Sequence, residues 1–297
     1  MNYLQWILKG IAMGAADVVP GVSGGTLAFI LGIYERLLNA ISAINVQAVK
    51  LLWQGRFNAF WQHIDGTFLL CLVSGILGSI FSLASIITWL LEHRAVPVWA
   101  FFNGLILTAL PVLLMAVKWS LWRGVLFLIG ALFALEVSML TAVELQPASW
   151  MFFAAGAIAI CAMILPGISG SFILLLLGMY SPVLLAVREL QFSVLFLFAT
   201  GCIIGLLSFT HFLKWLLQRC HDATLALLTG VVVGALYRLW PWQAGSEMLS
   251  PAKYAEKFGQ HDMLLAVGSF IAAVIVMLLL LNLERLLGKL PAKTQEH

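Results

Sequence analysis

Charged residues are scarce in this sequence. Asp, Glu, Lys and Arg make up 10% of its 297 residues, whereas hydrophobic residues make up 62%. Such a composition excludes an ordinary soluble domain and is typical of a polytopic membrane protein. The net charge is only +3, and basic residues do not cluster among aromatic ones. We therefore expect a membrane environment and no nucleic-acid partner.

Several sequence signals of chemistry are also missing. The four cysteines lack CxxC spacing, so we predict neither a metal site nor a cofactor. No Walker-type phosphate loop occurs, which argues against ATP hydrolysis by this chain. The first residues show no cationic segment followed by a separate apolar segment, so we expect no cleaved signal peptide.

One polar motif interrupts the apolar sequence twice. Asp17-Val-Val-Pro-Gly-Val-Ser-Gly-Gly-Thr26 breaks the first apolar run, and Met163-Ile-Leu-Pro-Gly-Ile-Ser-Gly-Ser-Phe172 breaks a later one. At an offset of about 146 residues, further positions also agree, among them Gly10 with Gly156 and Tyr34 with Tyr180. Proline removes a backbone donor and clashes with the preceding helical turn, so each motif predicts a helix break. Matching breaks in two halves of a membrane protein indicate a transporter binding site.

The repeat extends to the spans that follow each break. At an offset of about 126 residues, Gly75, Ser82 and Gly104 align with Gly201, Ser208 and Gly230. We therefore predict an all-α integral membrane bundle of two inverted repeats, each a re-entrant broken-helix hairpin plus three transmembrane helices. The first repeat, 1–145, holds the re-entrant segment 6–31, an interfacial insert at 47–66 and spans at 67–91, 97–117 and 124–141. The second, 146–297, holds the re-entrant segment 150–177 and spans at 193–217, 223–240 and 263–284.

The distribution of Lys and Arg predicts the orientation. If both broken segments are re-entrant and the N-terminus is cytoplasmic, 11 of the 16 Lys and Arg residues lie inside and five lie outside. If the broken segments cross fully, seven lie inside and nine outside. The positive-inside rule favours the first arrangement, with both termini cytoplasmic.

The two breaks form the predicted substrate site. Helix N-termini attract anions through free N–H groups, and hydroxyl side chains add donors without placing a fixed charge in lipid. The predicted substrate-binding residues are Pro20, Gly21, Ser23, Gly24, Gly25, Thr26, Arg36, Pro166, Gly167, Ser169, Gly170 and Ser171. The structural alternative is that these small residues only allow close helix packing.

Ionisable residues at membrane depth are the candidates for coupling. A charge at the bilayer centre costs about 3 kcal/mol on insertion scales, so Asp17, Glu136 and His211 should have a function or a partner. The predicted coupling residues are Asp17, Glu35 and Glu136, and Asp17 can alternatively brace the hairpin through backbone N–H groups. Glu35 and Arg36 are expected to pair with each other.

A serine hydrolase is the enzymatic alternative. Gly21-Val-Ser-Gly-Gly25 matches the G-x-S-x-G pattern, and Gly167-Ile-Ser-Gly170 matches the GxSG of rhomboid-type intramembrane proteases. A nucleophilic serine needs a nearby base, and His211 is the only histidine well inside a predicted span. Because the serine is duplicated by the repeat, we favour a transporter.

Gly14 to Thr26, followed by Gly32-Ile-Tyr-Glu35, closely resembles the PopT-type polyprenyl-phosphate transporter family, and the resemblance covers essentially the whole chain. It implies a protein of the bacterial cytoplasmic (inner) membrane that returns undecaprenyl phosphate from the outer to the cytoplasmic leaflet. It also implies functional roles for Asp17, Glu35, Arg36 and the motif residues of both repeats. A transporter or channel for a small soluble anion needs many of the same features, whereas a purely structural scaffold leaves the paired breaks unexplained. The residues predict no oligomeric state.

Overall fold

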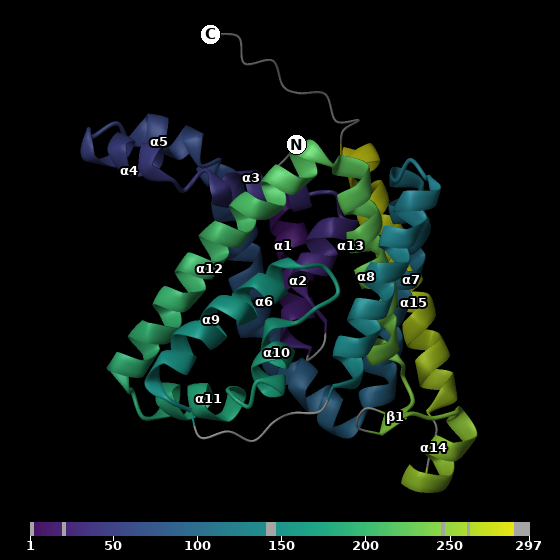
Figure 1. Ribbon diagram of the computed structural model, residues 1–297. Helices are drawn as coiled ribbons and strands as arrows, with labels where there is room; N and C mark the ends of the chain where they lie inside the picture. The colour runs from purple at the N-terminus through teal and green to yellow at the C-terminus, as the bar shows by residue number, and fades with distance from the viewer. Residues whose placement is uncertain (1–2, 20–21, 141–146, 245–246, 260–261, 288–297) are drawn as a thin grey trace.

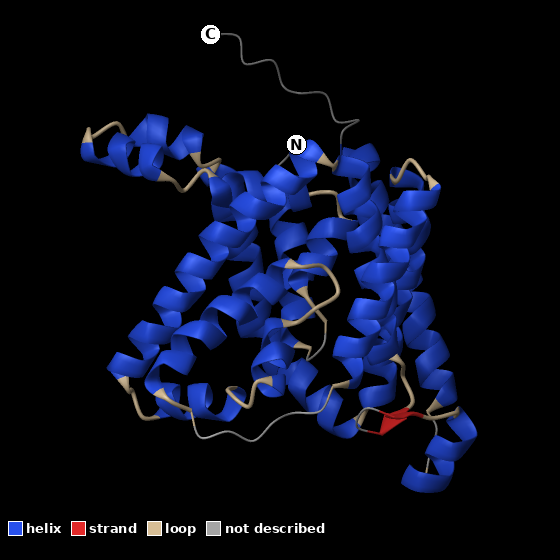
Figure 2. Ribbon diagram, in the orientation of Figure 1, coloured by secondary structure: helices blue, strands red, loops and turns tan. Residues whose placement is uncertain are grey.

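The computed structural model describes residues 3–19, 22–140, 147–244, 247–259 and 262–287. The described chain is almost entirely helical (Figure 2), with one short antiparallel pair formed by β1 (Gln243–Ala244) and β2 (Glu247–Met248). The predicted all-α polytopic membrane fold is confirmed, because several helices are long and apolar enough to cross a bilayer.

The first half of the chain contains one helix before the break, two short helices after it, two more in the insert, and three long ones. Its elements are α1 (Tyr3–Val18), α2 (Gly24–Ile30), α3 (Tyr34–Ser42), α4 (Val46–Trp53), α5 (Phe57–His63), α6 (Gly66–His93), α7 (Ala95–Ala116) and α8 (Leu121–Met139).

The second half lacks the insert and has additional short elements between its last two long helices. Its elements are α9 (Ser149–Ile164), α10 (Gly170–Leu176), α11 (Tyr180–Arg188), α12 (Phe192–Arg219), α13 (His221–Ala235), the 3-10 helix η1 (Leu236–Leu239), α14 (Pro251–Phe258) and α15 (Met263–Leu287).

Six segments of the described chain qualify as membrane spans by length and composition: α6, α7, α8, α12, α13 with η1, and α15. They lie at the six ranges that the sequence predicts. The helices of the two motifs are shorter, and α10 and α11 are bent by 107° relative to each other. A bend of this size fits either a broken span or a re-entrant segment, so the re-entrant arrangement remains a prediction.

A glycine makes the turn after each broken segment. Gly32, between α2 and α3, and Gly178, between α10 and α11, have φ of +69° and +65°. In both turns the next N–H donates back into the short helix, from Ile33 to the carbonyl of Ala28 and from Met179 to that of Leu174. This left-handed conformation favours glycine, so the same turn is encoded at both places.

Close helix crossings connect each broken segment to the first span of its own half. A Cβ on Gly75 of α6 would overlap the carbonyl oxygen of Ile7, and one on Gly201 of α12 would overlap that of Phe153. These contacts join α1 to α6 and α9 to α12. Only glycine permits such a backbone approach.

The remaining spans exchange partners between the halves. Gly104 of α7 packs against the backbone of Phe270 in α15, and Gly230 of α13 packs against that of Phe127 in α8. The pairs α7–α15 and α8–α13 therefore each contain one helix from each half. The two halves cannot be separate domains, since each supplies part of the other's packing.

The molecule has two distinct ends (Figure 1). The N-terminal part of α1, α3 and the insert lie at the upper end of this view, whereas α11, α14 and the β pair lie at the lower end. The insert helices α4 and α5 project sideways from the bundle. Val46, Trp53 and Phe57 are exposed there. These side chains fit the predicted interfacial position, which remains a prediction.

Candidate functional site

The two broken segments meet in the middle of the bundle. The Ser23 hydroxyl donates to the carbonyl oxygen of Met163 at 3.0 Å, and the Gly167 N–H donates to Thr26 Oγ1 at 2.7 Å. We call these two hydrogen bonds the joint. Each joins a residue of one motif to a residue of the other, so the joint links the two halves. Pro20 and Gly21 lie outside the described residues.

The first motif satisfies its own helix start. Ser23 caps α2 by accepting from the Gly25 N–H at 3.1 Å, and Asp17 Oδ1 accepts from the Gly24 N–H at 2.7 Å. The N–H groups expected to attract a substrate anion are thus already paired in this conformation. Asp17 therefore braces the hairpin through a backbone N–H, which was the predicted alternative to a coupling role. The two roles are compatible, because a carboxylate and a carboxylic acid can both accept this bond.

The second motif is similarly compact. The Ser169 and Ser171 hydroxyls lie 2.8 Å apart, and Ser169 is 5% exposed. Gly167 has φ of +92°, and a Cβ there would lie 2.9 Å from the carbonyl oxygen of Val231. Gly170 packs on α9, where a Cβ would meet the Ala159 carbonyl at 2.8 Å. Pro166 is buried. The structure therefore brings the two predicted serines and both glycines to the break itself.

The joint does not have the geometry of a serine nucleophile. Ser23 is 1% exposed, and the described partners of its hydroxyl are backbone groups. His211 is exposed on α12, with Nδ1 2.6 Å from the carbonyl of Leu207 on its own helix. A general base must reach the proton it removes, and neither hydrogen-bond partner of Ser23 can act as one.

Replacing Thr26 by Val should weaken the joint. The substitution removes the acceptor for the Gly167 N–H and leaves a donor unpaired, which costs about 1–3 kcal/mol. Thr229→Val is the matched control, because the buried Thr229 hydroxyl has no hydrogen-bond partner among the described residues. The midpoint temperature of thermal unfolding in detergent should fall for Thr26→Val and stay equal or rise for Thr229→Val. Equal midpoints for Thr26→Val and the unsubstituted protein would contradict a stabilising joint.

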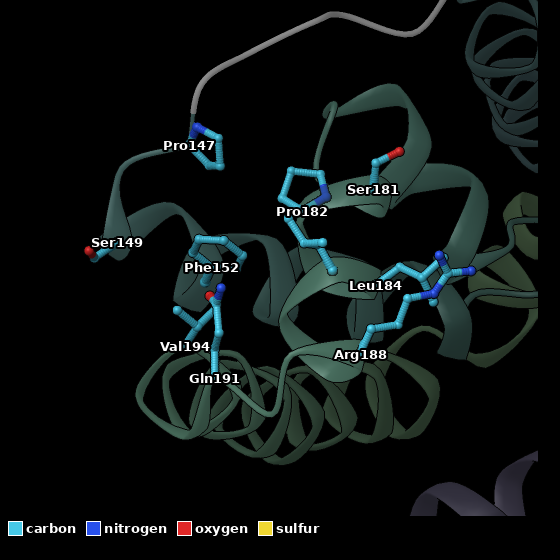
Figure 3. Close-up of a pocket in the computed structure, with 10 residues that line it drawn as sticks. Pro147, Ser149, Phe152, Ser181, Pro182, Leu184, Arg188, Gln191 and Val194 are labelled. Carbon is cyan, nitrogen blue, oxygen red and sulfur yellow. The ribbon is translucent and has the colours of Figure 1, made fainter.

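A cavity of about 750 Å³ lies at the lower end, between α9, α11 and α12. Figure 3 shows Ser149, Phe152, Gln191 and Val194 on one side of it, with Pro182 and Arg188 on the other. None of these residues belongs to the repeated motifs.

Arg36 is held away from the joint. Its guanidinium forms a two-point ion pair with Asp65, with Nε 2.6 Å from Oδ2, and lies over the rings of Trp6 and Phe68. The ion pair and the ring contacts fill the corner between α1, α3 and α6 at the upper end. Arg36 was predicted to bind substrate, and in this conformation its described partners are these three side chains.

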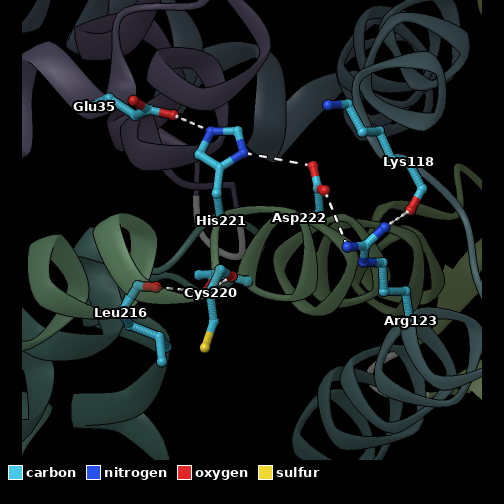
Figure 4. A network of polar contacts seen from close by, with 8 residues as sticks. Glu35, Lys118, Arg123, Leu216, Cys220, His221 and Asp222 are labelled. Atoms are coloured by element: carbon cyan, nitrogen blue, oxygen red, sulfur yellow. Dashed lines mark hydrogen bonds and ion pairs between the residues drawn. The ribbon is translucent and has the colours of Figure 1, made fainter.

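Glu35 enters a polar network at the upper end (Figure 4). His221 Nε2 lies 2.9 Å from Glu35 Oε1, its Nδ1 lies 3.6 Å from Asp222 Oδ1, and Asp222 pairs with Arg123 at 3.1 Å. The expected Glu35–Arg36 pair is therefore wrong. Consecutive residues of a helix point in different directions and cannot face each other, so each side chain found a partner on another element.

Two further cavities open beside this network. One of about 330 Å³ is lined by Glu35, His221 and the buried Tyr34, among others, and one of about 350 Å³ is lined by Glu35, Lys214 and His221. Lys214 also donates to the Ser42 hydroxyl at 3.2 Å. The upper end thus holds titratable groups of both signs around solvent-sized spaces.

Glu136 is not part of the joint. It is exposed in the last turn of α8, which ends at Met139. A charge at the end of a span can reach the interface, so this position offers a structural alternative to the predicted coupling role.

Two buried polar residues were missed. Lys9 and Gln5 of α1 are each 2% exposed, and Lys9 Nζ donates to the carbonyl oxygen of Leu31 at the end of α2 at 2.9 Å. The charge count placed Lys9 simply at the cytoplasmic side. Their spacing of four residues puts both on one helix face, and that signal was available in the sequence. The structure adds that this face points into the protein.

Packed helix breaks at the centre of an apolar helical bundle are a feature of membrane transporters. Residues 13–257 match the family described as undecaprenyl phosphate translocase-like, and the chain belongs to that family.

Two curated relatives agree with this assignment. The chain is 52% identical over 244 residues to a polyprenyl-phosphate transporter of Vibrio cholerae, covering 82% of this chain and 79% of the relative. It is 32% identical over 262 residues to a polyprenyl-phosphate transporter of Staphylococcus aureus, covering 81% of this chain and 88% of the relative. No solved structure matches. The protein is therefore a multi-pass membrane transporter and not an enzyme.

Proposed function

We propose that this protein returns polyprenyl phosphate, in particular undecaprenyl phosphate, from the outer to the cytoplasmic leaflet of the bacterial inner membrane. The observation that carries the proposal is the joint, in which hydroxyl and backbone groups of two opposed breaks meet between cavities at the two ends. The names of the two relatives support the same substrate class.

The joint could bind an anion with neutral donors, so no charged side chain is needed at the centre of the membrane. Moving an isolated phosphate through hydrocarbon costs tens of kcal/mol in the idealised limit. Opening the joint would release the Ser23 hydroxyl and the Gly167 N–H. Both groups can donate hydrogen bonds to a phosphate oxygen. The same two donors would then bind the headgroup in one state, and the Met163 carbonyl and the Thr26 hydroxyl in the next, while the polyprenyl chain stays in lipid.

The proposed orientation places the upper end of Figure 1 in the cytoplasm. It agrees with the Lys and Arg distribution, and α3 and α11, which follow the two breaks, lie at opposite ends of the molecule. Opposite ends are what inverted repeats require. The lower cavity would then face the outer leaflet, and the Glu35–His221 cavities would face the cytoplasm.

Transport in this direction needs a driving force. A phosphate monoester carries roughly −1.5 to −2 charges at neutral pH. Moving it inward opposes an inside-negative potential by about 2.3 kcal/mol per charge per 100 mV, or on the order of 3–5 kcal/mol. We therefore propose that a cation moves with the lipid and that Asp17 takes it up.

The test is transport of a fluorescent polyprenyl phosphate by the purified protein in liposomes. Transfer is detected with a quencher that reaches only the lipid in one leaflet. Imposed proton, sodium and voltage gradients should each be varied. We expect transfer that is faster with an inward cation gradient and absent with the matching neutral polyprenol. A protein that moves inorganic phosphate but no lipid phosphate would instead be a soluble-anion transporter. If the transfer rate does not change with any imposed gradient, the coupling proposal is refuted and the proposal of lipid transfer stands.

A further inference from the structure

The lower cavity contains a cation that has no ionic partner among the described residues. Arg188 is exposed at the last turn of α11 and lines the cavity, and it has no hydrogen bond or ion pair to any described residue. The nearest acidic residue in the sequence, Glu189, instead accepts from the Gln191 side chain at 2.6 Å. An exposed arginine at the edge of a cavity offers five donors suited to an oxyanion.

The corresponding corner of the first half shows why the cavity exists. At the offsets of the repeat, Trp6, Arg36, Asp65 and Phe68 correspond to Phe152, Pro182, Gln191 and Val194. In the upper corner, the Arg36 guanidinium lies 4.5 Å and 4.6 Å from the centres of the Trp6 and Phe68 rings and pairs with Asp65. In the lower corner, proline, phenylalanine and valine replace larger side chains, and Gln191 has no arginine to bind. The space that one half fills is open in the other.

The lining suits an amphiphile better than a free ion. Arg188, Gln191, Ser149 and Ser181 supply hydrogen-bonding groups, and all four are exposed in the cavity or at its edge. Phe152, Leu184, Leu185 and Val194 supply apolar surface. A volume of about 750 Å³ is within the range of sites for small organic ligands. An isoprenoid phosphate has the same two parts, a dianionic head and an apolar chain.

We propose that this cavity is the capture site for isoprenoid phosphate in the outer leaflet, with Arg188 binding the phosphate and Phe152, Leu184 and Val194 contacting the first isoprene units. The inference rests on the proposed function, because it uses the same substrate and orientation. The site lies outside the joint, so the lipid would bind here before the joint opens. The filled upper corner would have no such site, which makes capture one-sided.

The test measures binding to the full-length protein in nanodiscs with three probes: farnesyl phosphate, farnesol and inorganic phosphate. Arg188→Gln should weaken farnesyl phosphate binding about tenfold or more, as expected for a lost hydrogen bond to a charged group, and should leave farnesol unchanged. Lys253→Gln is the matched control, since Lys253 is an exposed cation on α14 that does not line the cavity. Val194→Phe, which copies Phe68, should fill the cavity and weaken both isoprenoid probes without unfolding the protein.

Several results would overturn the proposal. Equal farnesyl phosphate affinity in Arg188→Gln and Lys253→Gln would remove Arg188 from the site, and unchanged affinity in Val194→Phe would place the ligand elsewhere. Inorganic phosphate that competes as well as farnesyl phosphate would make this a free-anion site. A wild-type protein that moves lipid phosphate, while Arg188→Gln moves it equally well at low lipid concentration, would refute capture and leave the proposed function intact.

Discussion

Replacing Asp17 by Asn should abolish the dependence of transport on the imposed cation gradient. Asparagine cannot be protonated and carries no charge for sodium, so the lipid would move alone against the membrane potential. Opposing work of about 3–5 kcal/mol corresponds to a loss of at least a hundredfold in the accumulation that a 100 mV potential permits. This is the largest effect that we expect from a single isosteric change.

The structure makes this substitution informative because it separates coupling from bracing. Asp17 Oδ1 accepts from the Gly24 N–H at 2.7 Å, and the side-chain oxygen of asparagine can accept the same bond. The Asp17 side chain packs closely on Gly24, where a Cβ would lie 2.5 Å from Asp17 Oδ2. A larger side chain at position 17 would therefore disturb the break itself. Asp17→Asn should therefore fold normally and fail only in coupling.

The measurements are the initial rate and the final accumulation in liposomes under opposed and aligned proton and sodium gradients. Glu256→Gln serves as the control, because Glu256 is an exposed carboxylate on α14 far along the chain from the joint. It should keep the wild-type dependence. If Asp17→Asn responds to the gradients as the wild type does, Asp17 has only the bracing role.

Replacing Gly25 by Val should reduce transport by roughly 10–100-fold. A Cβ on Gly25 would lie 2.7 Å from the carbonyl oxygen of Met163 and 2.9 Å from that of Ile164, so the two breaks would have to separate. Overpacking of this kind costs about 1–3 kcal/mol. The cost falls on the joined conformation, so the equilibrium would shift toward conformations in which the joint is open.

Gly78→Val on α6 is the control for this effect. A Cβ at Gly78 meets nothing within 4 Å, so the same added bulk should leave transport near the wild-type rate. Lipid transport and the thermal midpoint should be measured together for both variants. Wild-type transport by Gly25→Val would mean that the joint in this structure is not a conformation through which the protein passes.

Composition and local pattern were sufficient to predict the fold class and the location of the helices. The long apolar runs predicted the six spans, and each Pro-Gly motif predicted a break at the place where α1 ends before α2 or α9 ends before α10. The turn glycines Gly32 and Gly178 agree in conformation as they agree in sequence. These features depend on neighbouring residues, because helix length, breaks and turns are decided by the side chains and backbone of a few adjacent positions.

Only the tertiary structure decided which groups meet. Ser23 and Thr26 bond to residues about 140 positions away, Arg36 binds Asp65 instead of Glu35, and Lys9 faces the protein interior. The cavity beside Arg188 likewise depends on side chains from three helices. A sequence motif shows that a donor is present, but the orientation of each helix decides its partner. Because the halves exchange packing partners, that orientation is set by contacts across the whole bundle.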